Sequence, residues 1–122
     1  MELWEKLQIK PESTVAVVNS PADGPTIEGP FTVSDHPGTA DVTIVFVKDR
    51  SEIESAAQPG IDAAIADRLA WVAYPKAKKL GTDLDRDLLA KELIARGIDP
   101  VRQVSLDDVW SALRFRPAFR AR

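Results

Sequence analysis

The sequence predicts an α/β fold in which a mostly parallel sheet closes with an antiparallel hairpin. Two β-branched runs, Thr14–Val18 and Val42–Val47, are typical of strands that are buried on both faces of a parallel sheet. Segments with helical periodicity alternate with the strands, which favours right-handed crossovers. The last two apolar runs, Val101–Leu106 and Val109–Phe115, have only two residues between them and predict a tight hairpin. The length of 122 residues fits a single domain spanning 1–122.

The N-terminal third is expected to contain one short helix and one or two strands. Apolar residues one helical turn apart in Leu3–Leu7 predict a helix that ends before Pro11. The strand Thr14–Val18 follows. Three prolines and two glycines make Asn19–Pro30 a loop. Phe31–Val33 is then expected to be a short edge strand.

Two helical pieces and a third strand are expected in the middle of the chain. Ser51 and Glu54 have the spacing of a capping box, which predicts a helix start at Ser51. The Pro59-Gly60 pair should break this helix, and a second helical piece should follow. Leu69–Tyr74 is expected to be a buried strand that Pro75 ends.

The segment Leu84–Arg96 carries the clearest helical pattern. Thr82 or Asp83 is expected to cap its start, and Gly97 is placed for the C-terminal cap. Pairs of opposite charge four residues apart are expected to form ion pairs on its outer face. These pairs are Asp87 with Lys91 and Glu92 with Arg96, and the expected apolar stripe is Leu89, Ala90, Leu93 and Ile94.

Composition excludes several classes of function. Sixteen basic and nineteen acidic residues give a net charge of -3, so a nucleic-acid partner is not expected. The absence of cysteine excludes disulfides, thiolate metal sites and a cysteine nucleophile, and a single histidine excludes a multi-histidine metal centre. No apolar run approaches a membrane span, and the charged N-terminus does not resemble a signal peptide. The expected location is the cytoplasm, with neither a metal nor a membrane partner.

Several segments resemble an uncharacterised bacterial family of small proteins, a domain of unknown function. The resemblance begins at Ile9–Pro11 and Val15–Pro21 and covers nearly the whole chain. Its most specific parts are Tyr74-Pro-Lys76 and the run Trp110–Phe115. The family looks like a shortened class I methyltransferase, so the resemblance implies a three-layer, Rossmann-like sheet.

The segment after the first strand departs from the methyltransferase pattern. A methyltransferase needs a Gly-x-Gly type of turn there, because glycines let the backbone approach the cofactor. This chain has Asn19–Gly24, in which Pro21 fixes φ and removes a donor. Glu28 and Asp35 are weak stand-ins for the acidic residue that binds the ribose. No cofactor is therefore expected, and a degenerate S-adenosylmethionine-binding protein stays as an alternative.

Polar residues at the carboxyl ends of the predicted strands are candidates for a ligand site. Ligands of open α/β sheets favour this edge. Tyr74 and Lys76 could bind an anion, and the start of a helix beside lysines suits a phosphate or carboxylate. The alternative is that Thr82 caps a helix and the lysines form a solvated loop. The candidate ligand-binding residues are Asn19, Ser20, Tyr74, Lys76, Thr82 and Asp83.

The C-terminal strand offers a candidate partner surface at Trp110, Arg114 and Arg116. The arginines alternate with apolar residues and could bind a partner's carboxylates or pair with Asp107. Trp110 could instead belong to the core or to an interface. Further arginines follow at Arg120 and Arg122, where a solvated terminus is the alternative. A homodimer formed through a sheet edge or the hairpin is a further possibility.

No catalytic constellation emerges from the residues. The serines lack a Gly-x-Ser-x-Gly elbow, and no phosphate-binding loop of the Walker type is present. The leading hypothesis is a non-catalytic binding or interaction module. The alternative is a protein or enzyme that binds a nucleotide, phosphate or carboxylate near Asn19, Tyr74, Lys76 and Thr82.

Overall fold

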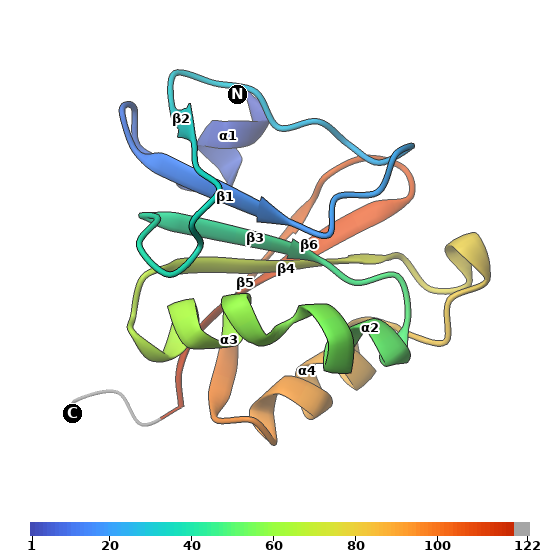
Figure 1. Cartoon of the computed structure of the whole chain (residues 1–122). Helices are drawn as coiled ribbons and strands as arrows, with labels where there is room; N and C mark the ends of the chain where they lie inside the picture. The colour runs from blue at the N-terminus through green and yellow to red at the C-terminus, as the bar shows by residue number, and fades with distance from the viewer. Residues whose placement is uncertain (119–122) are drawn as a thin grey trace.

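A single sheet of six strands organises the molecule (Figure 1). The computed structural model describes residues 1–118. The strand order is β2-β1-β3-β4-β6-β5. The first four strands are mutually parallel, and β6 is antiparallel to both of its neighbours. This confirms the predicted α/β class, the mostly parallel sheet and the antiparallel C-terminal pair. The strands are β1 (Thr14–Val18), β2 (Thr32–Val33), β3 (Val42–Phe46), β4 (Leu69–Pro75), β5 (Ile98–Ser105) and β6 (Trp110–Pro117).

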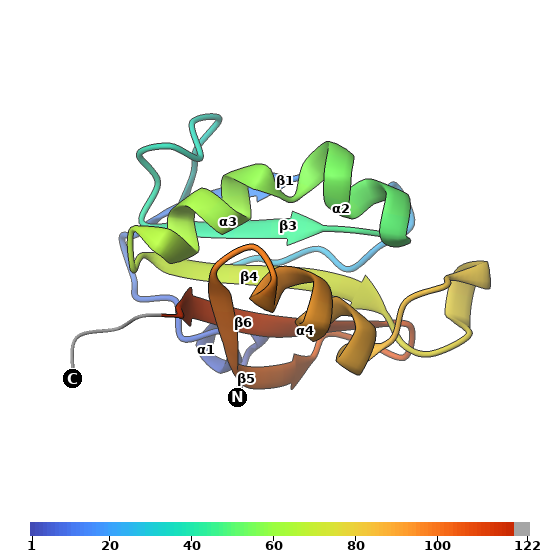
Figure 2. The same cartoon turned by 90° about the horizontal axis from the view of Figure 1, so that it is seen from below.

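Helices cover both faces of this sheet (Figure 2). Three of them, α2, α3 and α4, lie on one face, and α1 lies on the other. None of the helices within residues 1–118 is long and apolar enough to cross a bilayer. The helices are α1 (Leu3–Lys6), α2 (Arg50–Ala56), α3 (Gln58–Ile65) and α4 (Arg86–Ile94), with a 3-10 turn η1 at Lys79–Gly81.

The central strand β4 contributes to two separate cores. Val72 and Tyr74 pack on the face covered by α2, α3 and α4. Trp71 and Ala73 pack on the opposite face, which we call the α1 face. The indole nitrogen of Trp71 donates to the carbonyl of Leu7 at 3.0 Å, so the short first helix is tied to the sheet. Burial on both faces explains why β4 is almost continuously apolar.

The start of α2 differs from the prediction. Asp49, in an extended conformation, accepts from the backbone N–H of Glu52 and caps the helix, so the predicted start at Ser51 with Glu54 is wrong. The Ser51 hydroxyl instead donates to Asp49 at 2.5 Å. The break between α2 and α3 falls at Ala57 rather than at Pro59-Gly60, since the first turn of α3 accommodates a proline.

The helix α4 also begins later than predicted. Asp85 accepts from the N–H of Leu88 at 2.8 Å and caps it, so neither Thr82 nor Asp83 is the cap. Ile94 is exposed and does not belong to the buried stripe of Leu89, Ala90 and Leu93.

The predicted ion pairs along α4 are wrong: Asp87 pairs with the adjacent Arg86 at 3.2 Å rather than with Lys91, and Glu92 and Arg96 pair with residues of α2. Glu92 pairs with Arg50 at 3.4 Å, and Arg96 pairs with Glu54 at 3.0 Å. These charges therefore connect two neighbouring helices instead of stabilising one helix from outside.

The strand after α4 starts earlier than expected. β5 begins at Ile98 rather than Val101, immediately after Gly97, whose φ of 95° reverses the chain. The strand contains Pro100, and its register with β6 shifts between Pro100 and Arg102. This irregular strand forms one outer edge of the sheet.

Candidate functional site

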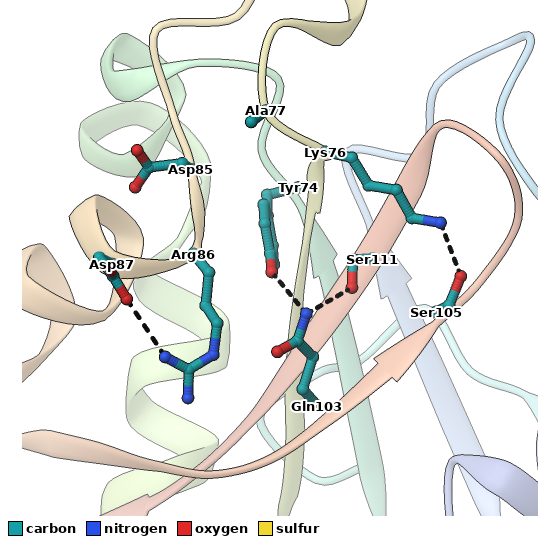
Figure 3. Close-up of a pocket in the computed structure, with 9 residues that line it drawn as sticks. All are labelled: Tyr74, Lys76, Ala77, Asp85, Arg86, Asp87, Gln103, Ser105 and Ser111. Atoms are coloured by element: carbon teal, nitrogen blue, oxygen red, sulfur yellow. Dashed lines mark hydrogen bonds and ion pairs between the residues drawn. The ribbon is translucent and has the colours of Figure 1, made fainter.

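A polar pocket of about 560 Å³ lies at the carboxyl ends of β4 and β5, beside the start of α4 (Figure 3). Residues from β4, β5, β6 and the start of α4 surround it. Its volume falls within the range of ordinary small-molecule sites. Its lining consists of Tyr74, Lys76, Ala77, Asp85, Arg86, Asp87, Gln103, Ser105 and Ser111.

Three side chains form a hydrogen-bonded platform in this pocket, made of Tyr74, Gln103 and Ser111. The amide nitrogen of Gln103 donates to the Tyr74 hydroxyl and to Ser111 Oγ, both at 3.4 Å. Ser111 Oγ in turn donates to the carbonyl of Val104 at 3.1 Å. Tyr74 and Ser111 are each only 2% exposed. Burial raises the pKa of the Tyr74 hydroxyl above its ordinary value of 10.0, which keeps it a neutral donor and acceptor.

Lys76 connects the end of β4 to the turn between β5 and β6. Its ammonium donates to Ser105 Oγ at 2.8 Å and to the carbonyl of Asp107 at 2.7 Å. Its backbone N–H donates to the carbonyl of Val109 at 2.7 Å. The lysine is therefore held at the rim of the pocket, and its charge is fixed close to the platform.

Charges of both signs come from the start of α4. Arg86 pairs with Asp87 at 3.2 Å, and both side chains are largely exposed. Asp85 uses a carboxylate oxygen to cap the helix. Figure 3 shows Arg86 and Asp87 on one side of Tyr74 and Lys76 on the other. A molecule in the pocket thus meets two cations, two carboxylates and an uncharged platform between them.

Three of the predicted ligand-binding residues instead hold the segment at the end of β3. Asn19 donates from Nδ2 to the carbonyl of Phe46 at 2.8 Å and to Glu52 Oε1 at 3.1 Å. The Thr82 hydroxyl donates to the carbonyl of Lys48 at 2.6 Å, and Asp83 accepts from the backbone N–H of Arg50 at 2.9 Å. Tyr74 and Lys76 therefore share a pocket that Asn19, Thr82 and Asp83 do not line, and Ser20 is exposed.

The three candidates for a partner surface occupy different environments. Trp110 is buried and packs edge-on against Phe46, with ring centroids 5.2 Å apart. Arg116 binds both carboxylate oxygens of Asp67 at 3.0 Å, and Arg114 donates to Gln8 Oε1 at 2.8 Å.

Asp107 does not pair with these arginines. Its carboxylate accepts from the N–H groups of Val109 and Trp110 and shapes the hairpin turn. Arg120 and Arg122 lie outside the described residues.

Apart from Tyr74 and Lys76, the lining residues were not predicted as site residues from the sequence; among them are Gln103, Ser111 and the charged residues Asp85, Arg86 and Asp87. The missed signal for Gln103 is its spacing of two from Ser105, because residues two apart lie on one face of a strand. Asp85 and Asp87 reach the pocket only because α4 begins beside the end of β4.

A second, more apolar hollow of about 380 Å³ lies near the end of β3. The loop after β1 and the β5–β6 turn both contribute to it. Its lining consists of Pro21, Ala22, Asp23, Gly24, Lys48, Leu80, Asp107, Val109 and Trp110. Trp110 is thus both a core residue and part of the wall of this hollow.

No protein-family model matches the chain, and no curated protein sequence matches it. The resemblance to a bacterial family stays a prediction. Within residues 1–118, no three histidine, aspartate or glutamate side chains gather in a way that could hold a metal ion.

Proposed function

We propose that this protein is a non-catalytic binding module that holds a small polar molecule in the Tyr74–Lys76 pocket. The observation that carries the proposal is the platform of Tyr74, Gln103 and Ser111 between charges of both signs. Pre-formed polar groups that converge in a concave site are typical of ligand pockets. The carboxyl ends of parallel strands are also where α/β sheets bind their ligands.

The lining favours a ligand with one anionic group and several hydroxyl or amide groups. A carboxylate or phosphate would lie near Lys76 or Arg86, whose charges attract it. The platform offers donors and acceptors to an uncharged polar part. Asp85 and Asp87 oppose a high negative charge, so a singly charged ligand fits better than a multiply charged one.

The hydrogen bonds around the pocket favour binding over catalysis. Ser111 Oγ donates to a backbone carbonyl, so no general base takes its proton. Burial raises the pKa of Tyr74, so its hydroxyl stays protonated near neutral pH and is not available as a general base. The Lys76 ammonium donates hydrogen bonds to two acceptors, Ser105 Oγ and the carbonyl of Asp107, so its role here is that of a donor.

We further propose that the scaffold is a three-layer, Rossmann-like sheet of the shortened methyltransferase type. Parallel strands β1 to β4 followed by an antiparallel closing hairpin support this classification. The loop that would hold a methyltransferase cofactor carries Pro21 beside Asn19, whose side chain is occupied by Phe46 and Glu52. A cofactor-independent role therefore agrees better with this scaffold.

Thermal stability of the full chain with and without ligands tests the binding proposal. The panel contains nucleotides, S-adenosylmethionine, nicotinamide cofactors, inorganic phosphate and simple carboxylates. A ligand at about 100 times its dissociation constant stabilises the native state by about 2.7 kcal/mol, which raises Tm by roughly 10 °C.

Two substitutions locate any ligand found in this way. Tyr74→Phe and Gln103→Leu should each weaken binding by roughly fivefold, the effect of losing one hydrogen bond of about 1 kcal/mol. Lys79→Met removes a lysine of η1 that does not line the pocket, and binding should be unchanged. A ligand that binds Tyr74→Phe and Gln103→Leu as tightly as the wild type would refute the assignment.

A further inference from the structure

A separate pocket of about 430 Å³ lies at the opposite edge of the sheet, where the parallel strands begin. The connection between α1 and β1 forms one wall, and the starts of β3 and β4 form another. Arg114 of β6 completes the lining from the α1 face. The lining residues are Gln8, Lys10, Ser13, Asp41, Val42, Leu69 and Arg114.

Arg114 lies in this pocket as a cation, and within residues 1–118 no carboxylate binds its guanidinium. Gln8 Oε1, a neutral oxygen, accepts from its Nη1 at 2.8 Å and is the acceptor that the structure shows for the guanidinium within residues 1–118. The Nε atom of Arg114 is buried and has no hydrogen-bond partner among these residues. An unpaired buried donor is costly, so the side chain is poised to gain from an added acceptor.

Neighbouring positive charges add to the uncompensated charge of Arg114. Arg102 is its register partner on β5, and Arg116 follows two positions along β6, so the three guanidinium groups share one face. Burial, followed by the repulsion of Arg116, lowers the pKa of Arg114. The carboxylate of Asp67 attracts Arg114 from a distance, but both of its oxygens are bound by Arg116.

The other lining groups define which anion fits. Lys10 adds a second cation and Leu69 adds half-buried apolar surface, whereas Val42 is buried behind them. Asp41 is the carboxylate of the pocket, and its Oδ2 accepts from the N–H and the hydroxyl of Thr14 at 2.9 and 3.2 Å. A dianion such as phosphate would be repelled by Asp41 more strongly than a monoanion would.

We propose that this pocket binds the carboxylate group of a small organic acid, with Arg114 as the main anchor and Lys10 as a second cation. The guanidinium is planar and matches a carboxylate with two parallel hydrogen bonds, whereas a lysine ammonium offers only a point charge. The apolar surface of Leu69 accommodates the carbon skeleton. This site is independent of the Tyr74–Lys76 pocket, because the two lie at opposite ends of the strands.

Nuclear magnetic resonance of the ¹⁵N-labelled full chain tests the proposal through the side-chain Nε–Hε signal of Arg114. Sodium acetate is the probe, sodium chloride at equal ionic strength is the control, and inorganic phosphate is the competing anion. Acetate should produce saturable shifts at Arg114 and at the Gln8 side-chain amide. Phosphate should bind more weakly than acetate, and chloride should produce no saturable change.

Substitutions separate the anchor from general electrostatic attraction. Arg114→Lys keeps the charge and should weaken acetate binding by roughly tenfold, as read from the Gln8 amide. Arg102→Lys, on the same face but outside the lining, should leave the affinity unchanged. Lys10→Met removes an exposed side chain, so the fold should tolerate it, and binding should weaken by about threefold.

Three results would overturn the assignment. One is a response to acetate that equals the response to chloride. Another is tighter binding of phosphate than of acetate, which would make the site one for phosphate. The third is an affinity that neither Arg114→Lys nor Lys10→Met reduces.

Discussion

Asn19 shows at the scale of one residue how a polar side chain at the end of a strand can serve the fold. Its φ of 59° is in the left-handed region, which asparagine tolerates better than most residues. From this position its amide reaches the carbonyl of Phe46 on β3 and the carboxylate of Glu52 in α2. The side chain thereby joins the ends of β1 and β3 to the first turn of α2.

Substitutions at Asn19 should separate its hydrogen bonds from its backbone conformation. Asn19→Gly loses both hydrogen bonds but adopts a positive φ freely, so it should lower the free energy of unfolding by about 1 kcal/mol. Asn19→Ala also carries the left-handed strain and should lose about 2 kcal/mol. Denaturation in urea measures both values. Ser20→Ala, at an exposed neighbour, serves as the control with a change within about 0.5 kcal/mol. A smaller loss for alanine than for glycine would contradict this account.

Tyr74 and Lys76 illustrate what sequence can predict about a site. Their position at the end of a buried strand was sufficient to place them at the carboxyl ends of the parallel strands, and both line the pocket there. The sequence does not show whether a polar group is already bound by the protein, because that depends on contacts between distant segments. Thr82 and Asp83 are examples, since their partners are the backbone atoms of Lys48 and Arg50.

At the scale of elements, the starts of helices show the same limit of prediction from the sequence. The capping-box spacing of Ser51 and Glu54 predicted α2 and the periodicity of apolar residues predicted α4, but several residues near each start could act as a cap. Asp49 and Asp85 are the caps because their backbones are extended at the points where the chain turns into the helix. Local sequence contains the candidates for this role, and the path of the chain from the preceding strand selects among them.

The close approach of α3 to the sheet depends on Gly60. A Cβ atom at this position would lie 2.9 Å from Cγ2 of Val45 on β3. Valine is stiff at χ1, so it does not yield easily. The glycine therefore sets the distance between the helix and the strand.

Gly60→Ala should consequently destabilise the protein although alanine favours helices. Overpacking costs about 1–3 kcal/mol and the gain in helix propensity is about 1 kcal/mol, so a net loss of about 1 kcal/mol is expected. Combining it with Val45→Ala should remove the clash, so that Gly60→Ala is neutral or stabilising in that background. Urea denaturation of the wild type, the single variants and the double variant measures the coupling. Strict additivity of the two substitutions would exclude the proposed contact.

For the whole molecule, the sequence predicted the class of fold but not the complete strand order. The short separation between the last two strands predicts that β5 pairs with β6. It does not tell which of the two pairs with β4. In the structure β6 does so, with Trp71 opposite Arg114, although the two residues are distant in the sequence. Such long-range pairing follows from how the whole sheet buries its faces, which no local pattern records.

The two pockets lie at opposite ends of the strands, so the two proposed sites are separate. Tyr74 belongs to one and Leu69 to the other, at the two ends of the same strand β4. A strand that is buried on both faces is a rigid support for side chains at either end. Ligands at the two sites are therefore expected to bind without mutual interference.

The irregularity in β5 should also control how the protein behaves in concentrated solution. An outer strand with regular backbone groups can accept a further strand from another molecule. Here Pro100 has no N–H to donate, and the register shift up to Arg102 interrupts the ladder. Replacing Pro100 with valine and deleting Val101, the extra residue between the pairs Pro100–Phe115 and Arg102–Arg114, should restore a regular edge. Light scattering should then show particle growth with concentration for the double variant and a constant size for the wild type; growth of the wild type would contradict this role.

A feature that weakens one strand would thus preserve the solubility of the whole population. The irregular edge contributes less to the stability of a single folded molecule than a regular strand would. It also removes the template from which ordered aggregates extend when many copies of the chain are crowded together. Colloidal stability in the concentrated protein would in this way depend on Pro100 and on the register shift between Pro100 and Arg102.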